Sequence, residues 1–162
     1  MNYPGIIESF KQTTMLNNIL IELFERDLNR LSNEISLYKQ EDDIWLVKEG
    51  ISNSSGNLCL HLLGNLNHFI GATLGHTGYV RHRDDEFSLK NIPRQDLLLN
   101  IDNCKLVVKG TLEKLTAADF EKDFPLKLND KTLSTMQMLI HLEGHLNYHL
   151  GQINYHRRLL EN

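Results

Sequence analysis

Apolar residues recur at steps of mostly three and four along the first part of the chain. From Ile6 to Tyr38 they return to one helical face at nearly every turn. This period of about 3.6 residues marks an amphipathic α-helix that buries a single stripe. We therefore expect a first long helix whose buried stripe consists of Ile6, Phe10, Leu16, Ile19, Leu20, Leu23, Leu28, Leu31 and Ile35.

Three further segments show the same helical period. The second helix is expected to start at 53–55, where Asn or Ser can cap the free backbone N–H groups, and to end near Gly75. The third starts at Pro93, a residue suited to a first helical turn, and runs to Leu115. The fourth begins near 132–134 and continues to the C-terminus.

The connections between these helices carry no convincing strand pattern. They cover 40–53, 80–92 and 119–131, and the last contains a candidate short extended piece at 124–128. Four long amphipathic helices pack most simply as a bundle around one core. The sequence therefore predicts an all-α fold, a four-helix bundle, in a single domain over residues 1–162.

Composition places the chain among ordinary globular proteins. Hydrophobic residues make up 41% and charged residues 23% of it, which excludes a disordered chain. The formal net charge of -4 is opposite to that of a dedicated nucleic-acid binder, so no nucleic-acid partner is expected. We see no signal peptide, no membrane-spanning segment and no C-x-x-C pair, and therefore expect a cytoplasmic protein that does not contact membranes.

Histidine spacing is the most informative feature of the sequence. The fourth helix carries four histidines at steps of four and seven, which keeps their side chains within about 80° of one helical face. Two imidazoles at positions i and i+4 can form half of a divalent-metal site. Outside metal sites, a helical histidine usually lies on the surface or forms hydrogen bonds in the core. The four residues are His141, His145, His149 and His156.

A helical bundle completes such a half-site with a ligand from a facing helix. The second helix offers His61 and His68, which also share a face. Spacing cannot choose between these two, nor between the pairs His141/His145 and His145/His149. From the residues alone, a three-histidine site with one open coordination position is a hypothesis with several possible ligand sets.

The residues H-L-N-Y-H-L-G-Q at 145–152 resemble the signature HxxxHxGQ on the last helix of the DinB/YfiT-like metal-binding bundles. In that family both histidines of the signature bind the metal. The third ligand is a histidine early in the second helix, usually followed by an apolar residue. His61 matches this position, whereas His68 lies two turns further on. The resemblance thus implies that the metal ligands are His61, His145 and His149.

Two longer motifs narrow the resemblance. Residues 53–65 read N-S-S-G-N-L-C-L-H-L-L-G-N, and residues 81–87 read R-H-R-D-D-E-F. They are similar to the patterns N-S-x-x-N-L-x-x-H-L-x-G-N and R-x-R-D-x-E-F of a DinB-related subfamily of unknown function. The likeness covers nearly the whole chain. One departure is His76, where that subfamily often has a second glycine after Gly75.

The resemblance also implies a function. Members of the family are four-helix bundles, usually homodimers, that bind one divalent ion such as zinc or nickel. Some members are transferases or isomerases that use a low-molecular-weight thiol. We therefore expect a metal-dependent thiol S-transferase that acts on a small thiol and an electrophile, with no catalytic residue of the chain assigned. The alternative is a non-catalytic helical bundle that the metal stabilises.

Other polar residues near the motifs have two interpretations each. Gln152 either hydrogen-bonds a ligand histidine or a metal-bound water, or bridges two helices. His141 is assigned to a dimer interface in preference to the surroundings of the metal. The charged residues between the second and third helices are expected to form ion pairs that order this connection; the alternative is that they bind an anionic substrate. They are Arg81, Arg83, Asp84 and Glu86.

Overall fold

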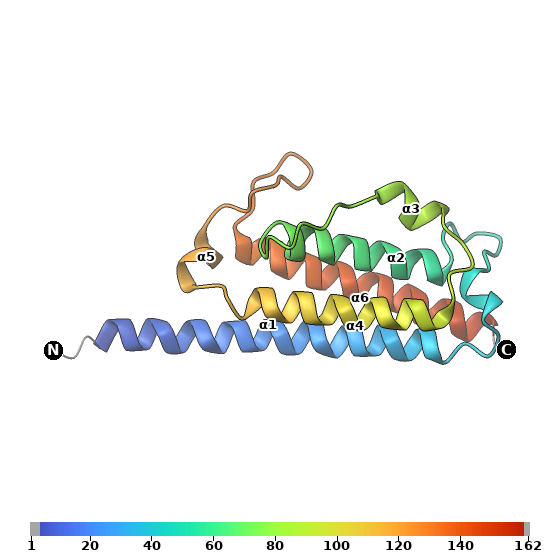
Figure 1. Cartoon of the computed structure of the whole chain (residues 1–162), viewed down its shortest axis with the longest axis horizontal. Helices are drawn as coiled ribbons and strands as arrows, with labels where there is room; N and C mark the ends of the chain where they lie inside the picture. The colour runs from blue at the N-terminus through green and yellow to red at the C-terminus, as the bar shows by residue number, and fades with distance from the viewer. Residues whose placement is uncertain (1–3, 161–162) are drawn as a thin grey trace.

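The computed structural model describes residues 4–160, with side chains from Met15 onward (Figure 1). This part of the chain contains six α-helices, a short 3-10 helix and a π-helix, with two isolated β-bridges and no longer strand. The expected all-α class is thus confirmed. The four longest α-helices lie side by side: α1 (Pro4–Ser36), α2 (Ser55–Leu66), α4 (Arg94–Leu112) and α6 (Thr135–Leu160).

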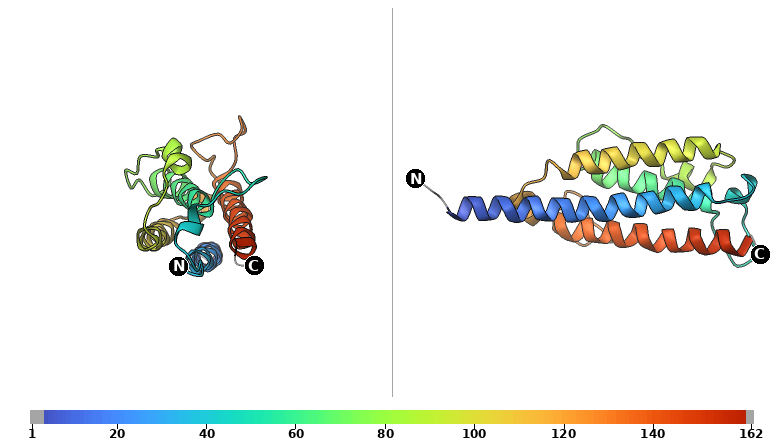
Figure 2. Two further views of the ribbon diagram at one scale, coloured as in Figure 1. Left: turned by 90° about the vertical axis from the view of Figure 1, so that its right-hand side faces the viewer. Right: turned by 90° about the horizontal axis from the view of Figure 1, so that it is seen from below.

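These four helices enclose one apolar core. Helix α1 contacts α4 and α6, and α2 contacts the same two helices, so that α1 and α2 occupy opposite corners (Figure 2). Burial of the apolar stripes is the main force that holds the helices together. Within residues 4–160, no helix is both long and apolar enough to cross a membrane. Fully buried side chains come from all four helices and include Phe24, Leu28, Leu62, Leu66, Leu97, Ile101, Leu142 and Leu146.

Two α-helices lie where the sequence predicted only connections, so the expected count of four helices was too low. Helix α5 (Ala117–Glu121) begins with a capping box in which Thr116 and Asp119 satisfy each other's backbone N–H groups. Helix α3 (Arg83–Ser88) has three acidic residues in its first turn, where negative charge stabilises a helix. Helices of five or six residues are too short to show a 3.6-residue period. The 3-10 helix η1 (Asp42–Trp45) was missed for the same reason.

The second predicted helix is divided in two. Helix α2 starts after Ser54, whose side chain accepts a hydrogen bond from the backbone N–H of Asn57 at 3.2 Å. It continues as the π-helix η2 (Asn67–Ala72) and turns out of the helix at 73–75, close to the predicted end. His76 then takes a φ of 51°, a left-handed conformation that favours glycine. A glycine would adopt this backbone conformation without strain.

The extended piece expected at 124–128 forms one side of a small hairpin-like loop. Leu128 and Lys131 exchange backbone hydrogen bonds of 3.0 Å in both directions. The two residues between them, Asn129 and Asp130, have φ values of 48° and 62°, which is the backbone of a tight hairpin turn. The loop leads directly into α6, which carries most of the candidate site.

Candidate metal centre

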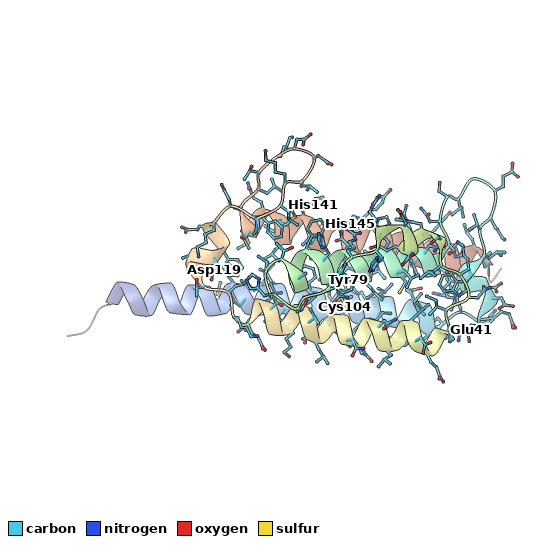
Figure 3. All side chains as sticks on the ribbon, turned by 45° about the horizontal axis from the view of Figure 1, so that its top comes forward. Glu41, Tyr79, Cys104, Asp119, His141 and His145 are labelled. Atoms are coloured by element: carbon cyan, nitrogen blue, oxygen red, sulfur yellow. The ribbon has the colours of Figure 1, made fainter. Side chains whose placement is uncertain are left out.

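The three histidines that the sequence resemblance selected meet between α2 and α6. The Nε2 atom of His145 lies 3.3 Å from Nε2 of His61 and 3.1 Å from Nε2 of His149. One ligand atom from each residue lies within 4.8 Å of the other two. His61 is buried, and the other two are half-buried. We call His61, His145 and His149 the three-histidine cluster; Figure 3 shows His145 on α6.

The other histidines that spacing left open as ligands lie elsewhere. The ring of His68 packs against Phe69, with 4.9 Å between ring centroids. His141 is exposed one turn before His145, and their ring centroids are 6.3 Å apart (Figure 3). His156 is buried at the other end of α6. Among the described side chains, only the three-histidine cluster groups three or more possible metal ligands at one point.

Hydrogen bonds on the outer nitrogens fix the tautomers of two cluster members. His61 Nδ1 lies 2.9 Å from Glu86 Oε2, and His149 Nδ1 lies 2.6 Å from Gln152 Oε1. Both oxygens accept, so both Nδ1 atoms carry the proton. A neutral imidazole has a single N–H, and each Nε2 therefore presents a bare lone pair to the centre of the cluster.

The third member, His145, cannot satisfy both of these lone pairs. If its Nε2 carries the proton, it donates to only one of the two facing nitrogens. Its Nδ1 is buried without a hydrogen-bond partner. A cation at the centre accepts the lone pairs of all three Nε2 atoms. Three nitrogens that bind one ion tetrahedrally at about 2.0–2.1 Å lie about 3.3 Å apart, close to the two Nε2 separations seen here. The donor set thus fits one divalent ion.

Two members of the cluster, His145 and His149, have pKa values lowered by their surroundings. Burial, with the neighbouring His149 and His61 rings, lowers the pKa of His145 to about 4. Burial also lowers the pKa of His149, although its hydrogen bond to Gln152 opposes the change. Desolvation disfavours the charged imidazolium in both cases. Both rings are therefore available as neutral nitrogen ligands at pH 7.

Glu86, on α3, connects the cluster to a buried ion pair. Arg81 Nε donates to Glu86 Oε1 at 2.6 Å, and Arg81 Nη2 donates to Oε2 at 2.9 Å. Burial alone would raise the pKa of the Glu86 carboxyl, but hydrogen bonds from His61 and Arg81 outweigh it and lower that pKa. Glu86 is thus an ionised acceptor that fixes the orientation of the His61 ring, as carboxylate partners of metal-binding histidines do.

Residues of the 53–65 motif position Glu86. Asn57 Nδ2 donates to the backbone oxygens of Glu86 at 3.0 Å and Leu89 at 2.9 Å, which ties α3 to α2. Gly64 leaves room for the carboxylate, because a Cβ atom there would lie 2.1 Å from Glu86 Oε1. The 53–65 and 81–87 motifs are therefore two halves of one structure around His61.

The sequence predicted the ion-paired connection but missed the contact from Glu86 to His61. Of the four residues in that cluster, Arg81 and Glu86 form the ion pair, while the guanidinium of Arg83 lies 5.6 Å from the Phe87 ring centroid. A signal was present in the sequence: Gly64 lies one turn after His61 on the same helix, and metal-binding histidines usually have an acidic partner. Gln152, in contrast, forms the hydrogen bond to His149 that one of its two interpretations predicted.

A cleft of about 670 Å³ lies beside the cluster, on the Gln152 side of His149. Its volume falls in the range that holds small organic molecules. No Lys, Arg, Asp or Glu side chain lines it. Its wall consists mainly of aromatic, aliphatic and amide groups, among them Ile51, Leu58, Tyr148, Gln152 and Tyr155.

Comparison with known proteins gives a family match. Residues 12–162 match the family described as "Protein of unknown function (DUF1572)". The matched range contains the three-histidine cluster and the segment that carries Glu86. No curated protein matches the chain.

Proposed function

The chain belongs to this DUF1572 family, and we propose that it is a DinB-like metalloprotein that binds one divalent ion, zinc or nickel, through His61, His145 and His149. The observation that carries the proposal is the convergence of three imidazole nitrogens, two of which are bare because Glu86 and Gln152 hold the protons on the opposite ring nitrogens. The resemblance of the sequence to DinB/YfiT-like bundles supports the same ligand set.

We further propose that the site transfers a low-molecular-weight thiol to an electrophilic carbon. Three histidine ligands leave a coordination position open, and a divalent ion bound there would lower the pKa of a coordinated thiol or water. In such a transfer the thiol releases its proton to water, its sulfur forms a bond to the carbon, and the leaving group departs with the bonding electrons. The reaction class rests on the family resemblance.

The residues around the site are suited to this chemistry. The cleft beside His149 has no formally charged lining, which favours an uncharged electrophile. No protein thiol competes with a small thiol, because Cys59 and Cys104 are both free and buried. Burial raises the pKa of both, that of Cys104 to about 12. The sulfur nucleophile of the reaction therefore has to come from a small molecule.

A purely structural role for the ion is the second candidate. The ligands come from two helices, His61 from α2 and His145 and His149 from α6. His61 and His145 are 84 residues apart in the sequence. An ion that joins them would stabilise the folded state whether or not it takes part in a reaction. This is the alternative function, a metal-stabilised helical bundle without catalysis.

Elemental analysis of the untagged protein tests the metal site. We expect about one zinc or nickel ion per chain in the wild type, a loss of that ion in His149→Ala, and full content in His141→Ala. The last variant is the matched control, because His141 is exposed on the same helix and binds none of the atoms of the cluster. A wild type that neither contains an ion nor takes up zinc or nickel on incubation would refute the site.

A second measurement separates the two functions. Metal-loaded wild type and His149→Ala are incubated with small thiols and uncharged electrophiles, and thiol consumption is followed. An enzyme consumes thiol only with the intact, loaded site. A structural metalloprotein shows a metal-dependent rise in melting temperature with no thiol consumption above that of the variant.

A further inference from the structure

The outward face of α6 carries a continuous apolar line. Four large side chains are strongly exposed there: 58% for Ile140, 64% for Tyr148, 64% for Tyr155 and 43% for Leu159. Two exposed glycines lie between them, and a Cβ atom at either would have nothing within 4 Å. Steps of three and four place all six on one side of the helix. We call this set the α6 stripe: Ile140, Gly144, Tyr148, Gly151, Tyr155 and Leu159.

The α6 stripe differs from an ordinary solvent-exposed face. In the described part of α1, the exposed positions include the apolar Met15 and Ile19, but charged residues such as Glu22 and Arg26 and several asparagines lie on the same helix. On α6 the only exposed residue with a formal charge is Arg158, at the edge of the stripe. Large apolar side chains combined with few charges are typical of the centre of a protein interface. Figure 2 shows α6 at the edge of the bundle, with no other helix on its outward side.

We propose that a second copy of this chain covers the α6 stripe, with the two α6 helices antiparallel across a two-fold axis. The positions of the six residues are symmetric about the midpoint between His149 and Leu150, and each glycine has a tyrosine at its symmetric position. In the antiparallel pair, Tyr148 therefore lies opposite the partner's Gly151, and Tyr155 opposite the partner's Gly144. Ile140 meets the partner's Leu159. Each tyrosine ring thus faces a glycine of the partner, whereas a parallel pair would place tyrosine against tyrosine and glycine against glycine.

This symmetry is what favours a second copy over an unrelated protein. A two-fold interface uses one surface patch twice, so the patch must be complementary to itself. The α6 stripe meets this condition at its two Tyr–Gly pairs, and its ends bring two aliphatic side chains, Ile140 and the partner's Leu159, into contact. Its four large side chains expose on the order of 500 Å² of apolar surface per copy, from typical side-chain areas. That is more than half of the roughly 800 Å² per partner that a stable interface buries.

The proposed contact also reaches the cleft beside the metal centre. Tyr148, Gly151 and Tyr155 belong both to the α6 stripe and to the lining of that cleft. A ring placed over Gly151 therefore closes one side of the cleft. The partner's Tyr148 would supply this ring, so that each cleft is completed only in the pair. The inference stands on the α6 surface, and it would give the homodimer implied by the family resemblance its contact face.

Disulfide cross-linking tests the register directly. Gly144→Cys and Tyr155→Cys proteins are mixed under mild oxidation; the native Cys59 and Cys104 are buried and stay silent. We expect a covalent dimer in the mixture and none in either protein alone. Identical positions lie 11 residues apart along the antiparallel pair, about 16 Å, which is too far for a disulfide. A Gly144→Cys protein that cross-links to itself would overturn the antiparallel register.

Molar mass measured by light scattering during gel filtration tests the surface. We expect a wild-type dimer, a monomer for Gly144→Lys, and a dimer for Gly110→Lys, the control glycine on α4 whose Cβ position is also open. A monomeric wild type overturns the proposal. A dimer that survives Gly144→Lys and gives no mixed cross-link keeps self-association but overturns the α6 face. Metal content is measured separately, so a failed metal site is distinguishable from a failed interface.

Discussion

The histidines of α6 lie in two opposite environments. The three-histidine cluster uses His145 and His149, and His156 follows two turns later on the same face of α6. His156 is 4% exposed, and both of its nitrogens have partners in the protein. Its Nε2 donates to the backbone oxygen of Leu46 at 3.0 Å, and its Nδ1 lies 2.7 Å from the hydroxyl of Tyr38 and 3.0 Å from that of Ser55.

The difference shows what helical spacing leaves undetermined. Spacing places all of these histidines on one face, but the facing segments decide what each becomes. Next to His156 they supply a carbonyl that accepts and a hydroxyl that donates, so the ring is a complete structural element. Next to His145 they supply only another imidazole, and its Nδ1 is left without a partner. Unsatisfied lone pairs that converge, rather than burial or spacing, distinguish a candidate metal site from a core histidine.

The largest expected effect comes from the same substitution made at both places. His145→Ala should weaken binding of zinc roughly 1,000-fold, since three ligands share a binding free energy of the order of 10 kcal/mol. His156→Ala should leave zinc affinity unchanged. It should lower the free energy of unfolding of the metal-free protein by about 3 kcal/mol, because a cavity forms and the Leu46 carbonyl and Ser55 hydroxyl lose a partner.

Two measurements on the same samples are needed for this comparison. Zinc affinity is obtained by competition with a coloured chelator, and stability by urea unfolding in the presence of a strong chelator. His145→Ala is expected to change the metal-free stability by only about 1 kcal/mol, because the half-buried ring loses at most one hydrogen bond, from its Nε2. Zinc loss in His156→Ala, without loss of folded protein, would contradict the division between the two groups.

A smaller effect is expected on the His61 side of the cluster. Glu86→Gln removes the charge that fixes the His61 ring and should weaken zinc binding about 10- to 100-fold. Gly64→Ala should act in the same direction without changing any ionisable group, since its Cβ would displace the Glu86 carboxylate. Gly110→Ala on α4 has open space at its Cβ and is the matched control. Full zinc affinity in Gly64→Ala would show that Glu86 does not need its present position.

The long helices and the ligand set were predictable for different reasons. Helices such as α1 and α6 repeat their apolar period over many turns, so the sequence shows them clearly. Periodicity alone left His61 and His68 equivalent, because both share a face of one helix. Only the family resemblance, which places the third ligand early in the second helix, singled out His61, and the structure then brought it to His145 and His149. The role of these residues as ligands stays a prediction.

Features that depend on tertiary contact could not be predicted from the period of apolar residues. Glu86 reaches His61 only because Asn57 ties α3 against α2 and Gly64 leaves a gap, and neither contact has a periodic signal. The short helix α5 depends on one capping box, which a pattern of apolar residues does not reveal. The positive φ of His76 is a further feature that the sequence did not show.

The smallest expected effect is at Gln152, the exposed counterpart of Glu86. Gln152→Leu removes the acceptor that holds the proton on His149 Nδ1, but water can replace it at an exposed position. Zinc affinity should therefore fall by less than about 10-fold. Gln152→Glu should raise it a few-fold, because a carboxylate accepts the same hydrogen bond more strongly and makes the opposite ring nitrogen more basic. The chelator competition assay measures both. An affinity loss in Gln152→Leu as large as that in Glu86→Gln would show that burial of the acceptor does not determine its importance.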